Sequence, residues 1–200
     1  MRRVFIMLLA SVACIVSAVA QTTPQEWLTK LRSTLGSSYA WNISVATSGE
    51  QLEGYYIVEG DGYYLRLGAM EVYSDGTLRY EVNNARMEVT EDRVNLKAVD
   101  LLTNPTRAFS FVDKEYSISL GESSASGAVL KLVPRGSSMG LTHITLVLGQ
   151  GSGVVYPKKI EYSYDDESIT ISLSKRNKAD SQLPRWDKER YKGYDIVSFL

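Results

Sequence analysis

The first apolar stripe of the chain after residue 22 has helical spacing; its members are Trp27, Leu28, Leu31 and Leu35. Thr23 and Glu26 stand at the spacing of a capping box, and Pro24 between them suits the first helical position. Gly36 follows the stripe and suits a C-terminal cap. The pattern therefore predicts an amphipathic helix of about three and a half turns.

From Tyr39 onward apolar and polar residues alternate with a period of two, which predicts strands with one buried face. Hairpin turns are indicated at Ser48-Gly49, Gly60-Asp61-Gly62, Asp75-Gly76, Asn83-Asn84 and Asp165-Asp166. The alternating segments are Tyr63–Leu67, Leu78–Val82, Ala85–Val89, Tyr116–Leu120, Ala128–Val133, Leu141–Leu148, Val155–Tyr164, Ser168–Ser174 and Tyr194–Val197. We expect about ten or eleven antiparallel strands in all.

The segment 95–111 breaks the alternation and separates two runs of strands. It holds Leu101, Leu102, Phe109 and Phe111 and a helix-start signal at Asn104-Pro105, which predicts one or two short helical turns. One-faced antiparallel sheets need a cover, and two short helices cover only part of one long curved sheet. We therefore predict a mainly β fold in which an unclosed half-barrel surrounds an apolar cavity. A closed barrel or sandwich packed on itself is the alternative.

The N-terminal twenty residues have the three parts of an export signal. Arg2 and Arg3 precede an apolar run, and Ala18 and Ala20 form an A-x-A cleavage site. We expect cleavage after Ala20 and a single periplasmic domain over residues 21–200. A lipid anchor at Cys14 is the less favoured interpretation.

Composition excludes several classes of function. Lys plus Arg number 22 against 23 Asp plus Glu, a balance that gives no broad attraction to nucleic acid. One His and one Cys do not suffice for a structural zinc site or an intrachain disulfide. His143 lies on the opposite strand face from Ile144 and Leu146, so no catalytic triad is credible. We expect a binding protein with no cofactor or metal rather than an enzyme.

Several segments, in order, resemble the LolA-like periplasmic carriers of outer-membrane lipoproteins. They are Gly54–Gly60, Tyr64–Leu67, Tyr73–Tyr80, Asn104-Pro105, Leu130–Pro134 and Trp186–Val197. The resemblance implies an unclosed barrel with a helical lid and a monomeric carrier that takes the acyl chains of lipidated proteins. It also implies two partners, an inner-membrane lipoprotein-releasing transporter and an outer-membrane acceptor. Another lipid or glycolipid, or a lipoprotein-sensing module of the same fold, is the alternative.

The chain departs from the family at one hairpin. Where well-known members have a basic residue and Pro, this sequence has Glu59-Gly60-Asp61, so the family's lid-closing contact is not transferred to any residue.

The one-faced positions give a set of candidate cavity residues, for each of which an ordinary core position is the alternative. The candidate walls are Leu31, Leu35, Leu65, Leu67, Tyr80, Val82, Met87, Ile144, Leu146, Leu148, Ile160, Tyr162 and Ile171, and the candidate lid residues are Leu101, Leu102, Phe109 and Phe111. Thirteen Tyr against four Phe suit a cavity rim, where a hydroxyl reaches water. Strand propensity is the alternative explanation for the tyrosines.

Overall fold

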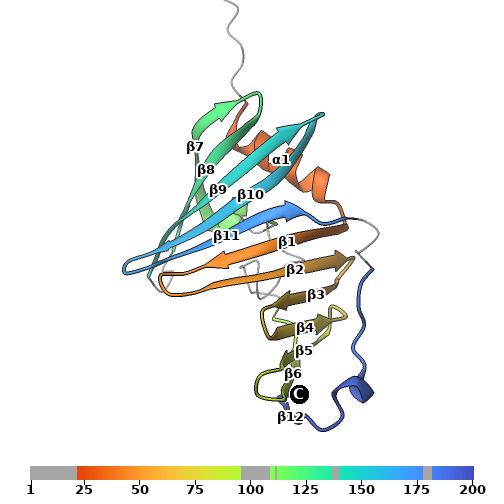
Figure 1. Ribbon diagram of the computed structural model, residues 1–200. Coiled ribbons are helices and arrows are strands. Elements are labelled where there is room, and N and C mark those ends of the chain that lie inside the picture. The colour runs from red at the N-terminus through yellow and green to blue at the C-terminus, as the bar shows by residue number, and fades with distance from the viewer. Residues whose placement is uncertain (1–21, 96–108, 111, 137–139, 178–181) are drawn as a thin grey trace, which may run out of the picture.

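The computed structural model describes residues 22–95, 109–110, 112–136, 140–177 and 182–200, which form a mainly β fold around one curved sheet (Figure 1). The twelve described strands have the order β12-β6-β5-β4-β3-β2-β1-β11-β10-β9-β8-β7, and only β12 joins its neighbour in parallel. Their bounds are β1 Ser38–Ala46, β2 Gln51–Glu59, β3 Gly62–Leu67, β4 Met70–Ser74, β5 Leu78–Asn83, β6 Glu88–Arg93, β7 Tyr116–Ser124, β8 Gly127–Pro134, β9 Leu141–Gly151, β10 Val154–Tyr164, β11 Ser168–Lys175 and β12 Asp195–Ser198. The predicted half-barrel is confirmed.

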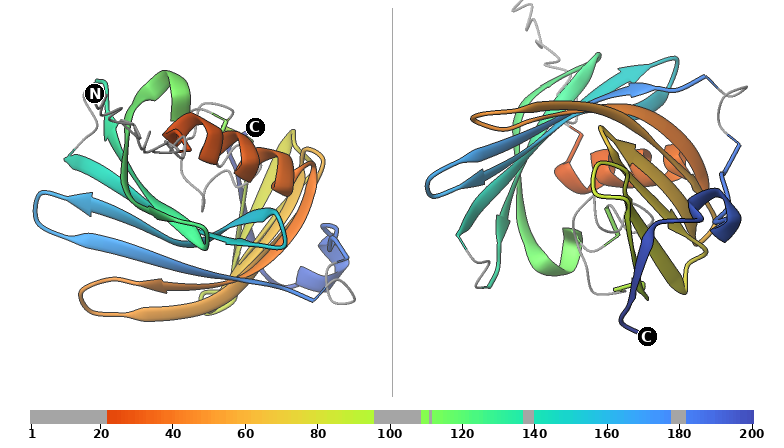
Figure 2. Two further views of the ribbon diagram at one scale, coloured as in Figure 1. Left: turned by 90° about the horizontal axis from the view of Figure 1, so that it is seen from above. Right: turned by 60° about the horizontal axis from the view of Figure 1, so that its bottom comes forward.

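Helix α1 (Pro24–Leu35) begins and ends as its sequence predicts. The Thr23 backbone N–H donates to Glu26 Oε2 at 2.7 Å, and the Glu26 N–H donates to Thr23 Oγ1 at 3.2 Å, which completes the capping box. Gly36 follows with a φ of 58°, in the left-handed region that favours glycine. The helix lies in the hollow of the curved sheet, where it contacts β10 and β7 (Figure 2).

The concave face of the sheet carries the main core. Four side chains of α1 pack there against alternate residues of the strands from β1 to β4 and from β7 to β11. Leu31, Leu130, Leu146 and Ile171 are fully buried in this concave core. The space beneath the helix is therefore filled by the chain's own side chains.

The sheet divides into two arms where β10 and β11 separate. These strands pair over five residue pairs, from Lys159 with Ser172 to Ser163 with Ser168. Beyond that point β10 continues to Val154 beside β9, and β11 continues to Lys175 beside β1. An irregularity between Pro157 and Lys159 marks the point of separation. The two arms diverge toward the C-terminal end of α1 (Figure 1).

The apolar face changes sides along the first strands, which corrects the prediction for Tyr80 and Val82. Val82 lies opposite Glu71 and Tyr80 opposite Tyr73, whereas Val72 of the concave core lies opposite Glu81. Because directly opposed residues share a face, Tyr80 and Val82 point away from the concave core. They join a second apolar cluster on the convex face.

The C-terminal segment from Leu183 to Tyr194 covers this second cluster. We call the rings of Tyr64, Tyr73, Tyr80, Trp186 and Tyr191 the aromatic cluster. The Trp186 ring is stacked on Tyr80 at 4.4 Å and on Tyr191 at 5.1 Å between centroids. The following 3₁₀ helix Lys188–Tyr191 places Tyr191 against the sheet, where it is 3% exposed.

The segment before β6 and the middle of the chain differ in part from the prediction. Met87, predicted as a buried strand residue, is 52% exposed with a φ of 54° because the β5–β6 turn extends to this position. Helix α2 (Val112–Glu115) lies between the two runs of strands. Phe109, a predicted lid residue, is buried in the concave core, and Arg32 of α1 donates to its carbonyl at 2.8 and 3.1 Å.

Some predictions fall outside the described residues. They are the export signal with Cys14 and the lid residues Leu101, Leu102 and Phe111. Within the described parts of the chain, no helix has both the length and the apolar character needed to span a membrane.

Candidate functional site

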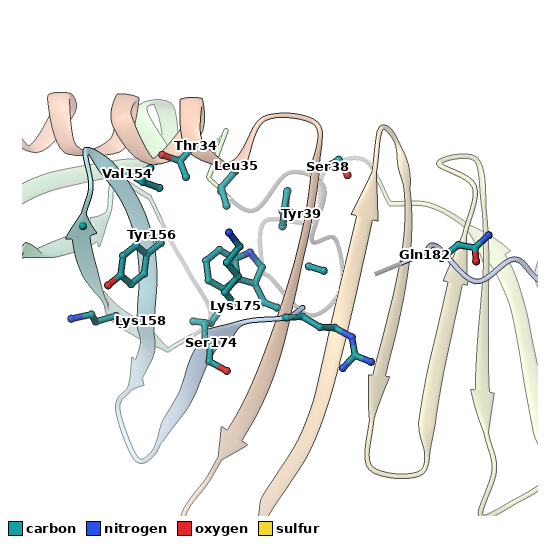
Figure 3. A pocket seen from close by; sticks show the side chains of 15 residues that line it. Thr34, Leu35, Ser38, Tyr39, Val154, Tyr156, Lys158, Ser174, Lys175 and Gln182 are labelled. Atoms are coloured by element: carbon teal, nitrogen blue, oxygen red, sulfur yellow. The ribbon is translucent and has the colours of Figure 1, made fainter. Parts of the chain in front are cut away.

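A pocket of about 1030 Å³ opens where the two arms of the sheet diverge, and we call it the mouth pocket (Figure 3). Five elements contribute to it: the C-terminal end of α1, the start of β1, the end of β9, the start of β10 and the end of β11. Its described lining residues are Thr34, Leu35, Ser38, Tyr39, Ala40, Trp41, Gly151, Val154, Tyr156, Lys158, Leu173, Ser174, Lys175, Arg176 and Gln182. The volume lies at the upper end of the range of about 300–1,000 Å³ typical of ligand sites.

The wall of the mouth pocket is aliphatic and aromatic. Leu35 comes from α1, Trp41 from β1, Tyr156 from β10 and Leu173 from β11. Leu35, Trp41 and Leu173 also belong to the concave core, so the pocket continues its apolar surface to the outside. Such a wall binds a hydrocarbon through loss of water-exposed apolar area.

The rim of the mouth pocket is polar. Thr34, Lys158, Lys175 and Gln182 lie at exposed positions around it. Burial raises the pKa of the Tyr39 phenol, so this ring faces the pocket uncharged at physiological pH. An apolar wall with a hydrophilic rim fits an amphiphile that keeps its head group in water.

The structure separates the candidate cavity residues into three groups. Leu35 lines the mouth pocket. The concave core contains Leu31, Leu65, Ile144, Leu146, Leu148, Ile160 and Ile171, with Leu67 and Tyr162 half-buried at its edge. Tyr80, Val82 and Met87 lie outside the concave face, as described above. Contact of any of these residues with lipid stays a prediction.

Sequence reasoning missed most of the mouth pocket. Tyr39 and Trp41 alternate with Ile43 and Val45 in the same period of two, a signal that was available. The pairing of β10 with β11 begins at Lys159, directly after the irregularity at Pro157. A proline within a strand is typical of a bulge or a sheet edge, so Pro157 was a second available signal.

A second, more polar pocket of about 830 Å³ is lined by the β2–β3 turn, the β4–β5 turn and the C-terminal segment. Glu59, Asp61 and Asp75 come from two hairpin turns, and Arg185 and Trp186 come from the C-terminal segment. Glu59 and Asp61 of the β2–β3 hairpin thus lie beside the C-terminal segment.

The remaining chemical features among the described residues concern metal binding and the partner of His143. There, no group of three His, Cys, Asp or Glu side chains is placed to hold a metal ion. His143 is half-buried on β9, with Nδ1 at 3.1 Å from Thr142 Oγ1.

Comparison with known proteins finds a solved structure that shares the fold of this chain. No family model and no curated protein sequence matches the chain. An uncharacterized conserved protein from Thermus thermophilus aligns over 87% of this chain and 98% of its own, at 14% identity and a TM-score of 0.53. This alignment indicates the fold alone.

Two further solved structures align less closely. A LolA superfamily protein from Nitrosomonas europaea aligns over 86% of this chain and 98% of its own, at 12% identity and a TM-score of 0.40. LprF from Mycobacterium bovis aligns over 82% of this chain and 99% of its own, at 13% identity and a TM-score of 0.41. Scores below 0.5 support no inference on function.

Proposed function

We propose that this protein binds acyl chains in the mouth pocket and carries acylated cargo, lipoproteins above all, through the periplasm. The observation that carries the proposal is an apolar space of about 1030 Å³ that is open at a hydrophilic rim. Each methylene transferred from water into such a space contributes about 0.8 kcal/mol. In this proposal an inner-membrane transporter delivers the cargo, and an outer-membrane acceptor receives it.

Cargo release requires a wall that moves, and in this proposal the last turn of α1 is that wall. Leu35 lines the pocket from the last turn of the helix. Near this turn, Arg32 Nη1 lies 2.6 Å from Asp113 Oδ2, in an ion pair whose two side chains are 32% and 48% exposed. An exposed ion pair contributes about 1 kcal/mol or less, so the end of the helix is weakly held at this contact. A tighter-binding acceptor then shifts the equilibrium toward release.

Fluorescence titration with cis-parinaric acid tests acyl binding. Thr34→Trp places a large ring at the exposed rim and is expected to weaken binding about tenfold, the equivalent of two buried methylenes. Ser33→Trp is the matched control, because Ser33 is an exposed neighbour on α1 that does not line the pocket. Absence of saturable binding to the wild type, or equal binding by the two variants, contradicts the proposal.

Depletion of the protein in its host tests the carrier role. We expect lipoproteins to accumulate in the inner membrane, Ser33→Trp to restore their distribution, and Thr34→Trp to fail. Normal lipoprotein distribution after depletion would show that the protein is not their carrier.

A further inference from the structure

The charges at the mouth pocket differ from those of the chain as a whole. The sequence has 22 basic and 23 acidic residues, which nearly cancel. Around the mouth pocket, the described lining residues include Lys158, Lys175 and Arg176 but no Asp or Glu. The rim of this apolar space is therefore locally cationic, which favours a negative group on the ligand.

The two lysines come from different arms of the sheet. Lys158 lies near the start of β10, at the irregularity between Pro157 and Lys159. Lys175 ends β11 opposite Trp41, whose side chain lines the pocket. Figure 3 shows Lys158 at one edge of the pocket beside Tyr156, and Lys175 near its centre below Leu35. Each arm of the sheet thus contributes one ammonium group to the lining of the pocket.

The irregularity in β10 accounts for the direction of Lys158. Its neighbour Lys159 resumes the regular register opposite Ser172 and makes an ion pair with Glu161 at 2.9 Å. Lys158 is the extra residue of β10, placed between Pro157 and Lys159, and it lines the pocket instead. Such an extra residue re-aims a side chain, often beside a binding site.

Neither rim lysine has a carboxylate partner among the described residues. Lys158 makes a cation–π contact with Tyr156 at 5.9 Å, which leaves its ammonium able to bind an anion. Arg176 differs, because it donates to Asn42 Oδ1 at 3.0 Å and covers the Tyr55 ring at 3.8 Å. The anion site therefore depends on Lys158 and Lys175.

From this arrangement we infer that the mouth pocket selects anionic glycerophospholipids, whose acyl chain lies against Leu35, Trp41 and Leu173 and whose phosphate head lies between Lys158 and Lys175. The inference rests on the proposed acyl-binding function and adds a second class of ligand beside the lipoproteins. Ammonium groups attract a phosphate as point charges, and an adjacent choline cation offsets that attraction.

Competition between matched lipids tests the inference. The purified protein is incubated with vesicles of equal parts phosphatidylglycerol and phosphatidylcholine with identical chains and re-isolated, and its bound lipid is quantified. At low salt we expect about fivefold enrichment of phosphatidylglycerol, which shrinks at high salt. The double variant Lys158→Gln/Lys175→Gln is expected to bind the two lipids without enrichment of either. Lys131→Gln, at an exposed position on β8, is the charge-matched control and keeps the enrichment.

The outcomes separate this inference from the proposed function. Equal binding of both lipids by the wild type, or enrichment that survives in the double variant, overturns the headgroup selection and leaves acyl binding intact. Failure to bind either lipid or cis-parinaric acid overturns both.

Discussion

Glu71 is a buried carboxylate on the convex face, 5% exposed, and its hydrogen bonds explain its presence there. It accepts from Tyr64 Oη at 2.6 Å, from Tyr73 Oη at 2.8 Å and from Asn84 Nδ2 at 2.9 Å. Arg190 of the C-terminal segment lies 3.5 Å away. Burial alone would raise the pKa of Glu71, but these hydrogen bonds and the Arg190 charge lower it below its usual value.

We expect Glu71→Gln to lower the free energy of unfolding by about 2 kcal/mol at pH 7, because hydrogen bonds to a charged group are weakened. A pKa lowered by folding contributes stability above the unfolded pKa of about 4.3 and loses it as pH falls through the folded pKa. The difference between wild type and variant should therefore shrink below about pH 4. Urea unfolding at several pH values measures it.

Glu50→Gln is the control for this experiment, because Glu50 is exposed in the β1–β2 turn. A Glu71→Gln variant as stable as Glu50→Gln at pH 7 would show that the buried network does not hold the C-terminal segment.

The sheet face that an alternating residue occupies could not be predicted from its own segment. Leu65 and Leu67 alternate with polar residues as Tyr80 and Val82 do, and the two patterns are equivalent in the sequence. The two pairs nevertheless point to opposite faces of the sheet. The strand register decides this, because it places Val72 on the concave face and Tyr73, which lies opposite Tyr80, on the convex face. Four of the thirteen tyrosines belong to the aromatic cluster, which accounts for part of the abundance of tyrosine.

Among the elements, α1 was predictable to the residue because its signals are local. Its cap and its apolar stripe each depend on residues within one turn. The β10–β11 separation was missed: Pro157 indicates a bulge or an edge in this strand, but which neighbour β10 parts from depends on pairing between strands. The mouth pocket, which lies at that separation, was missed for the same reason.

The packing of α1 gives a prediction for the whole helix. Leu31 is fully buried between the helix and the sheet, so Leu31→Ala should lower the free energy of unfolding by about 3 kcal/mol through lost burial and a cavity. Thr29→Ala, at an exposed position of the same helix, should be neutral or slightly stabilising. Urea unfolding compares the two, and equal stability would mean that α1 is not packed as described.

At the scale of the molecule, two apolar clusters lie on opposite faces of one sheet. Strands β3 and β4 contribute to both, with Leu65 and Val72 on one face and Tyr64 and Tyr73 on the other. Neither cluster can lose its strands without exposing the other. We therefore expect the described parts of the chain to unfold as one cooperative unit.

Tryptophan fluorescence tests this cooperativity. Trp186→Phe leaves Trp27 and Trp41 to report on the concave core, and Trp27→Phe/Trp41→Phe leaves Trp186 to report on the aromatic cluster. Within each variant, the fluorescence and far-ultraviolet circular dichroism transitions in urea should coincide. Separated transitions in either variant would indicate that the two faces unfold independently.

The overall architecture was predictable to a large extent. Alternating segments and hairpin turns gave the strands, and the scarcity of helix gave the unclosed sheet. The covering of the convex face was missed, because it brings Trp186 and Tyr191 against strands about a hundred residues earlier in the chain.

The five residue pairs between β10 and β11 also limit how far the two arms of the sheet can separate. Further separation of the arms breaks this short ladder one residue pair at a time. The pairing among β7 to β10 and among β11 to β12 of the strand order stays intact. If the mouth pocket binds acyl chains as proposed, accommodation of longer or additional chains would cost a few backbone hydrogen bonds and would separate Ile160 from Ile171 in the concave core. The ladder and the core beside it would therefore limit the chain length that the pocket accepts.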